Sequence, residues 1–73
     1  MDNSNRLAFR QMLASYPDVL DAEQMCRALG ISTKTGYRLL KEGAIKGIKV
    51  GRAYRVPKIR VIEYLLQGTN HEK

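Results

Sequence analysis

With 73 residues, the chain is long enough for one domain, and its 44% hydrophobic and 27% charged residues are typical of a globular protein. The formal net charge of +6 at pH 7 favours a polyanionic partner. Cys26 and His71 are the single cysteine and the single histidine, so we expect no disulfide, no metal site and no cofactor. Paired carboxylates, a nucleophile elbow and a glycine-rich phosphate loop are also missing, and no enzymatic activity is predicted.

No apolar run approaches the roughly 18 residues that a membrane span needs, and the first residues are polar. We therefore expect a cytoplasmic protein that is neither exported nor inserted into a membrane. The buried core of so short a chain is small, because about 60% of the unfolded surface is removed from water at this size.

The first predicted element is a helix over about residues 5–16. Its apolar residues, Phe9, Met12, Leu13 and Tyr16, recur at the spacing of one helix face. Pro17 disfavours a helical conformation at the residue before it and ends the helix there. We expect this helix to pack on the core, and a docking face for a partner protein is the alternative.

Residues 21–32 predict a second helix followed by a tight turn. Asp21 is a favourable N-cap, with Gln24 three residues later as in a capping box. The apolar face contains Ala22, Met25, Cys26 and Leu29. Gly30 suits the left-handed conformation that ends many helices, and Ser32 is suited to cap the next helix. Two short helices joined in this way indicate a helix-turn-helix.

The helix that follows Ser32 has two chemically different sides. Gly36, Leu39 and Leu40 share the side that we expect to pack on the core. The opposite side is basic and consists of Lys34, Arg38 and Lys41, flanked by Thr35 and Tyr37. Residues 34–60 contain nine basic residues against Glu42 alone, a net charge of +8 that exceeds the +6 of the whole chain. The sequence therefore predicts a helix that contacts DNA.

Residues 48–56 alternate between apolar and basic side chains and predict two antiparallel strands. A three-residue loop, Gly51 to Ala53, would pair Val50 with Tyr54 and Ile48 with Val56 on one apolar face. It would also place Lys49 opposite Arg55 on the outer face. A two-residue loop would mix the faces, so we predict the three-residue loop, with the basic outer face turned to phosphates.

A last helix is predicted from Pro57, with an apolar face of Val61, Ile62, Leu65 and Leu66. Lys58 and Arg60 in its first turn oppose the helix dipole, which suggests that they contact phosphates. Residues 68–73 are predicted to be a frayed polar tail. The predicted fold is thus mostly α with a small two-stranded β wing, a winged helix-turn-helix with its core at about residues 19–67 in a single domain covering residues 1–73.

The order of these elements resembles that of the excisionase family of small, MerR-like winged helix-turn-helix proteins. The motifs that carry the resemblance are DAEQ at 21–24, LGIS at 29–32, GYRLLKEG at 36–43 and VGRAYRVP at 50–57. The resemblance implies that the basic helix enters the major groove while Arg52, at the tip of the wing, reaches the minor groove or backbone. Gly36, where Val or Ile is usual in the family, and the basic turn after Pro57 depart from the pattern.

The predicted DNA contacts combine this resemblance with the charge pattern. They are Thr33, Lys34, Thr35, Tyr37, Arg38, Lys41, Lys49, Arg52, Arg55, Lys58 and Arg60. The implied function is sequence-specific binding of double-stranded DNA by an architectural factor that promotes integrase-mediated excision of a mobile element. Such a protein would be associated with the nucleoid and have an integrase or other recombinase as a partner.

A small winged-helix transcription regulator is the alternative function, and an RNA-binding or protein-binding module is a further one. We expect a monomer in solution, because the predicted core uses most of the apolar side chains. On DNA, monomers would bind cooperatively in a head-to-tail arrangement over direct repeats.

Overall fold

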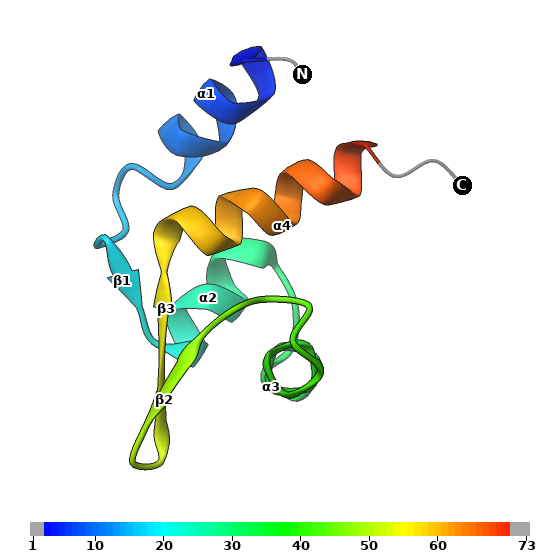
Figure 1. Ribbon diagram of the computed structural model, residues 1–73. Coiled ribbons are helices and arrows are strands. Elements are labelled where there is room, and N and C mark those ends of the chain that lie inside the picture. Colours follow the sequence, from blue (N-terminus) through cyan, green and yellow to red (C-terminus); the bar gives the residue numbers. More distant parts are fainter. Residues whose placement is uncertain (1–2, 71–73) are drawn as a thin grey trace.

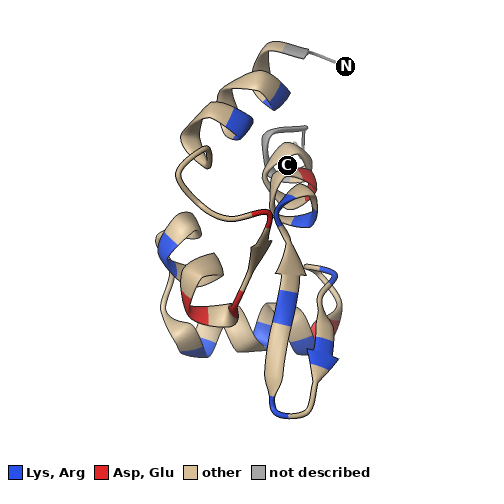
Figure 2. Cartoon of the chain, turned by 90° about the vertical axis from the view of Figure 1, so that its left-hand side faces the viewer, with Lys and Arg blue, Asp and Glu red and all other residues tan. Residues whose placement is uncertain are grey.

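The computed structural model describes residues 3–70, within which it has four α-helices and three short β-strands (Figure 1). In chain order they are α1 (Asn3–Met12), β1 (Val19–Leu20), α2 (Ala22–Leu29), α3 (Thr33–Glu42), β2 (Ile48–Val50), β3 (Ala53–Pro57) and α4 (Lys58–Asn70). Helix α3 and the β2–β3 hairpin form one end of the molecule, and α1 lies at the other end (Figures 1 and 2).

The N-terminal helix α1 ends at Met12, earlier than the prediction of about residue 16. After Leu13 the backbone hydrogen bonds are of the 3₁₀ type, from residue i to residue i−3. Ala14 N donates to Gln11 O, and Tyr16 N donates to Leu13 O. Leu13 is buried, as predicted, and Phe9 and Tyr16 are half-buried. Met12 is 52% exposed, so its assignment to the packed face is wrong.

Both helices of the predicted helix-turn-helix are capped by the predicted residues. Asp21 Oδ1 accepts from Gln24 N at 2.7 Å and Asp21 N donates to Gln24 Oε1 at 3.0 Å, which completes the capping box of α2. Gly30 ends α2 in the left-handed conformation with φ 70°, and Ile31 N returns to Cys26 O. These local interactions fix the short turn that leads into α3.

Helices α2 and α3 approach each other closely at Gly36, which is buried on the inner face of α3. A Cβ atom at this position would overlap Cys26 Sγ and lie 3.1 Å from Met25 Cε. The Cys26 side chain thus fills the space that a larger residue at position 36 would need. This explains why glycine is compatible with the core at a position where it is otherwise a poor helix residue.

The strands form a three-stranded antiparallel sheet in the order β1-β3-β2, whereas the sequence predicted two strands. Val19 pairs with Pro57 and Leu20 with Val56. Residues 19–20 are too few for alternation to reveal a strand, and only pairing with β3 defines it. Pro57, predicted to open the last helix, is the last residue of β3.

The predicted register of the hairpin is wrong. The loop has two residues, Gly51 and Arg52, and Ile48, Lys49 and Val50 pair with Arg55, Tyr54 and Ala53. Gly51 adopts φ 63°, and no non-glycine residue in the described chain has positive φ, as expected for a two-residue turn with glycine first. This turn matches the twist of the strands and prevails over the apolar pairing that favoured a longer loop. Lys49 and Arg55 therefore lie on opposite faces.

In this register, no described helix or strand covers the sheet face that carries Ile48 and Val50. Ile48 and Val50 are 62% and 59% exposed, and Val19, on the same face, is 49% exposed. The expectation that the core would use most of the apolar residues is therefore not met on this face.

The core lies on the other side of the sheet, between the strands and the helices. Leu20, Val56 and Val61 are fully buried there, together with Met25 of α2. Ile45, in the connection between α3 and β2, is also buried, although nothing in its local sequence predicted it. Helix α4 continues through Asn70, so the predicted tail is wrong for residues 68–70, and residues 71–73 lie outside the described part.

Candidate nucleic-acid interface

The outward face of α3 carries the basic side chains that the sequence placed there. Lys34, Arg38 and Lys41 are exposed, while Gly36 and Leu40 are buried on the opposite side. Thr33 is also exposed, and Tyr37, at the edge next to the hairpin, is 41% exposed. A helix of this length with one free cationic face can lie in the major groove of B-DNA, which is about 12 Å wide.

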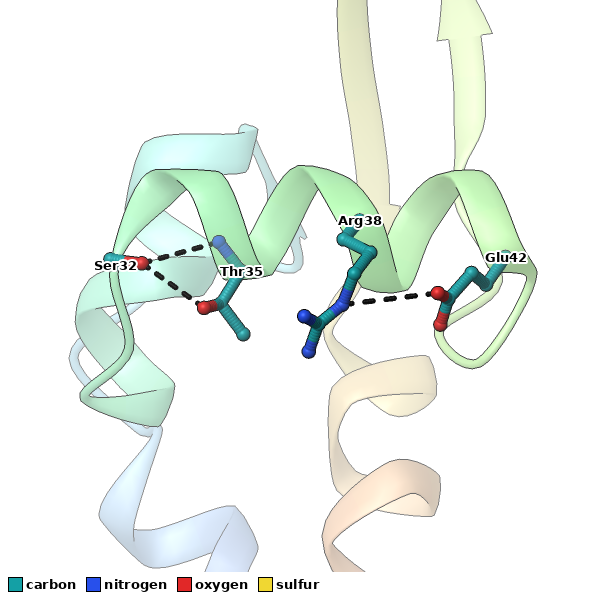
Figure 3. A network of polar contacts seen from close by, with 4 residues as sticks. All are labelled: Ser32, Thr35, Arg38 and Glu42. Carbon is teal, nitrogen blue, oxygen red and sulfur yellow. Dashed lines mark hydrogen bonds and ion pairs between the residues drawn. The ribbon is translucent and has the colours of Figure 1, made fainter.

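The start of α3 is fixed by Ser32, whose hydroxyl interacts twice with Thr35 (Figure 3). Ser32 Oγ accepts from Thr35 N at 3.2 Å and donates to Thr35 Oγ1 at 3.1 Å. The Thr35 hydroxyl, a predicted DNA contact, thus takes part in the N-cap. Thr35 is half-buried and keeps only part of its surface available.

Arg38 has an acidic neighbour, Glu42, on this face. Its Nε lies 3.8 Å from Glu42 Oε2, and the two side chains are 64% and 59% exposed (Figure 3). An exposed i,i+4 pair of this kind contributes little stability, in the range of about 0.3–0.5 kcal/mol. Because the pair with Glu42 is weak, the Arg38 guanidinium can exchange this carboxylate for another hydrogen-bond acceptor.

The β2–β3 hairpin extends the basic surface beyond α3 (Figure 2). Arg52 is exposed in the two-residue loop at the tip. Lys49 lies on the hairpin face that carries Tyr54, and its Nζ is 5.7 Å from the centroid of the Tyr54 ring. Arg55 is on the other face of the hairpin, where it is the cross-strand partner of Ile48.

An aromatic contact joins the hairpin to α3. The rings of Tyr37 and Tyr54 have centroids 5.8 Å apart with an interplanar angle of 61°, an edge-to-face arrangement. The helix and the hairpin therefore share side-chain contacts on the end of the molecule where their basic residues gather.

Lys58 has a different place from the one expected. Its Nζ donates to Leu13 O at 3.1 Å and to Tyr16 O at 2.9 Å in a partly buried position. The ammonium thus donates hydrogen bonds to two carbonyl groups in the turn that follows α1. The interpretation of this residue as a phosphate contact is revised, because its donors are directed into the protein.

Arg60, like Lys58, lies in the first turn of α4, which follows the end of β3 that is remote from the hairpin tip. Its Nη1 is 2.9 Å from Glu63 Oε1 on the next turn of α4. Since an extended strand rises by about 3.3 Å per residue, positions 52 and 58 are separated by roughly 20 Å along the chain. The structure does not bring Lys58 and Arg60 together with α3.

Two residues near this surface were missing from the predicted set. Lys46 is exposed in the connection from α3 to β2, and its positive charge was the available signal. Tyr54 contacts Tyr37 and pairs with Lys49 in the two-residue hairpin register. The predicted three-residue loop paired Tyr54 with Val50 instead, so the sequence did not indicate that Tyr54 lies beside Lys49.

Cys26 behaves as a core residue, as predicted. Burial raises the pKa of its thiol, and a backbone hydrogen bond with Gly36 opposes this effect while nearby Glu23 adds to it. A buried thiol with a raised pKa has little of the thiolate form that nucleophilic chemistry needs at neutral pH.

A shallow groove of about 620 Å³ lies at the other end of the molecule. It is lined by Arg10, Ala14, Asp18, Pro57, Lys58, Ile59 and Ile62. Within residues 3–70, no group of three or more His, Cys, Asp or Glu side chains is placed to hold a metal ion. In the same described part, no helix combines the length and the apolar character needed to cross a bilayer.

Comparison with protein families agrees with this geometry. A family model described as a helix-turn-helix domain matches residues 19–69, which begin at β1 and leave α1 outside. Comparisons with curated proteins and with solved structures give no match.

Proposed function

Because the chain belongs to the helix-turn-helix domain family, we propose that it binds double-stranded DNA sequence-specifically as an excisionase-like architectural factor. In this proposal the β2–β3 hairpin is the wing of a MerR-like winged helix-turn-helix. The protein promotes integrase-mediated excision of a mobile element, with the recombinase as its partner on the DNA.

The observation that carries DNA binding is the exposed basic face of α3 beside the basic hairpin. Lys34, Arg38 and Lys41 occupy the outward face, and Arg52 lies at the hairpin tip. In the proposed complex α3 lies in the major groove while the tip reaches the adjacent minor groove or the backbone. Thr33, Tyr37 and Lys49 border these contacts, and Arg55 approaches phosphates from the outer face of the hairpin.

We assign base reading to Arg38 and backbone contact to Arg52. Arg38 is at the middle of the exposed face, and a guanidinium can donate two parallel hydrogen bonds to the O6 and N7 atoms of guanine. Arg52 is on a loop, where its charge attracts phosphates without requiring a particular base.

The test starts with selection of preferred duplexes from a random pool, followed by binding measurements at fixed salt. Arg38→Ala should cost about 1 to 3 kcal/mol on the selected site and reduce the ratio of specific to non-specific affinity. Arg60→Ala is the matched control, since that guanidinium is paired with Glu63 away from α3. An unchanged ratio in Arg38→Ala would contradict the assignment.

The architectural role is supported by the resemblance of residues 20–66 to the excisionase family, together with the small size of the DNA-binding unit. We propose that the protein is monomeric in solution. Its free edge strand β2 has three residues with Lys49 at the centre, features that disfavour edge-to-edge pairing. Arg55 also interrupts the exposed apolar face of the sheet.

Monomers would bind direct repeats cooperatively in a head-to-tail arrangement and bend the duplex. Bending a site of about 20–30 bp costs on the order of 1–6 kcal/mol, which joint occupancy of several sites can offset. Footprinting and circular-permutation gels should show repeated sites that fill together on bent DNA. A stable dimer that protects one inverted repeat without bending it would instead identify a transcription regulator.

A further inference from the structure

The hairpin is held against α3 by one side chain of its projecting part. Among residues 48–55, Tyr54 is half-buried, and every other residue is exposed. Its ring packs edge-to-face with that of Tyr37 on α3, with centroids 5.8 Å apart, and Lys49 Nζ lies 5.7 Å from the centroid of the Tyr54 ring. The base of the hairpin is anchored separately, because Gly47 passes close to Leu40 and Val56.

This contact links the two parts of the proposed interface. Tyr37 is on the helix that carries Arg38, and Tyr54 is two residues from Arg52 at the tip. A group that is already held in its bound position loses less conformational entropy on binding than a mobile one. Two linked contacts also strengthen each other when their separation matches that of their targets.

We infer that Tyr54 is a positioning residue for DNA binding, which holds Arg52 at a fixed offset from Arg38 through the ring of Tyr37. The inference rests on the proposed function and names a residue outside the expected contact set. Tyr54 acts in the free protein by orienting the hairpin, and the contact with DNA is made by Arg52.

The experiment is a double-mutant cycle in which wild type, Arg52→Ala, Tyr54→Ala and the double variant are titrated with the selected duplex. In the wild type, Arg52→Ala should weaken binding about tenfold, equivalent to about 1.4 kcal/mol. In the Tyr54→Ala background the same change should cost less than about twofold, because a hairpin that is no longer held contributes little. Such non-additivity measures coupling between the two positions.

Two matched variants separate positioning from simple loss of stability. Tyr54→Phe keeps the ring and should retain the full effect of Arg52→Ala. Ile48→Ala changes an exposed residue on the other face of the hairpin, and its effect should add to that of Arg52→Ala. Far-UV circular dichroism and thermal unfolding establish that each variant is folded at the temperature of the titration.

If Tyr54→Ala does not fold, Tyr37→Ala breaks the same contact from a side chain that is 41% exposed. It should likewise reduce the effect of Arg52→Ala. Additive effects of the paired substitutions, or an Arg52→Ala variant that binds like wild type, would overturn the inference. The proposed function would still stand in those cases if Arg38→Ala lost specificity, whereas a wild type that binds no duplex DNA would overturn both.

Discussion

At the scale of single residues, Gly36 and Cys26 form a matched pair between α2 and α3. A methyl group at position 36 would overlap Cys26 Sγ. In Gly36→Ala the usual cost of overpacking, about 1 to 3 kcal/mol, opposes a gain of about 1 kcal/mol in helix propensity. Because the overlap with the sulfur is severe, the overpacking cost should be the larger, and Gly36→Ala should lower the free energy of unfolding by up to about 2 kcal/mol.

The Cys26→Ala background tests this explanation, because it removes the sulfur that occupies the space. There, Gly36→Ala should cost less than about 1 kcal/mol. Urea unfolding followed by circular dichroism measures both differences. Equal costs of Gly36→Ala in the two backgrounds would show that the sulfur is not the obstacle.

Lys58 is the second residue with a specific structural role. Lys58→Met keeps the aliphatic stem but removes the donor to Leu13 O and Tyr16 O. Leaving partly buried carbonyl groups without this donor should lower the free energy of unfolding by about 1 to 3 kcal/mol. Affinity for DNA at fixed salt should stay close to that of the wild type.

Chemical denaturation and DNA titration of the same variant distinguish this role from phosphate contact. Arg60→Met serves as the control, since an exposed ion pair such as Arg60–Glu63 contributes at most about 1 kcal/mol. If Lys58→Met had normal stability but weakened DNA binding, that result would support the sequence-based prediction that Lys58 contacts phosphate.

At the scale of elements, the β2–β3 hairpin depends on its two-residue turn. Gly51 has φ 63°, a conformation that costs other residues about 1–2 kcal/mol. Gly51→Ala should therefore weaken the hairpin and lower DNA affinity, with little change in the thermal midpoint because the projecting residues are mostly exposed. Binding titrations and amide exchange of residues 48–55 report the two effects.

Gly51→Asn is the appropriate control for this turn, because asparagine tolerates a positive φ better than alanine does. It should bind DNA more tightly than Gly51→Ala. If both variants bound like wild type, the hairpin would not contribute to the interface.

At the scale of the whole molecule, the cations are divided between two ends. Of the nine basic residues in 34–60, Lys58 and Arg60 have intramolecular partners away from α3. The remaining set can neutralise about four or five phosphates, which predicts a slope of log affinity against log salt of about −4. Counting all nine residues would have predicted a slope of about −5.

Titrations between low and moderate salt measure this slope directly. Arg52→Ala should make it shallower by about one unit, and Lys58→Met should leave it unchanged. A wild-type slope near −1 would contradict binding through a basic surface of this extent.

The sequence by itself determined the local features of this protein. Asp21 and Ser32 as N-caps, Gly30 as the end of α2, and the division of α3 into a packed and a basic face follow from interactions within a few residues. The helix-turn-helix, which the family match supports, could be predicted for this reason.

The tertiary structure alone decided the features that depend on partners distant in sequence. Strand β1 exists because β3 pairs with it, Ile45 is buried because the core closes over it, and Lys58 is held by carbonyls more than 40 residues earlier. The hairpin register shows a related limit, since the apolar pattern favoured a three-residue loop whereas the structure has the two-residue turn with Gly51 at positive φ. That choice placed Tyr54 against Tyr37, a contact whose energy depends on the geometry between elements and is absent from the local sequence.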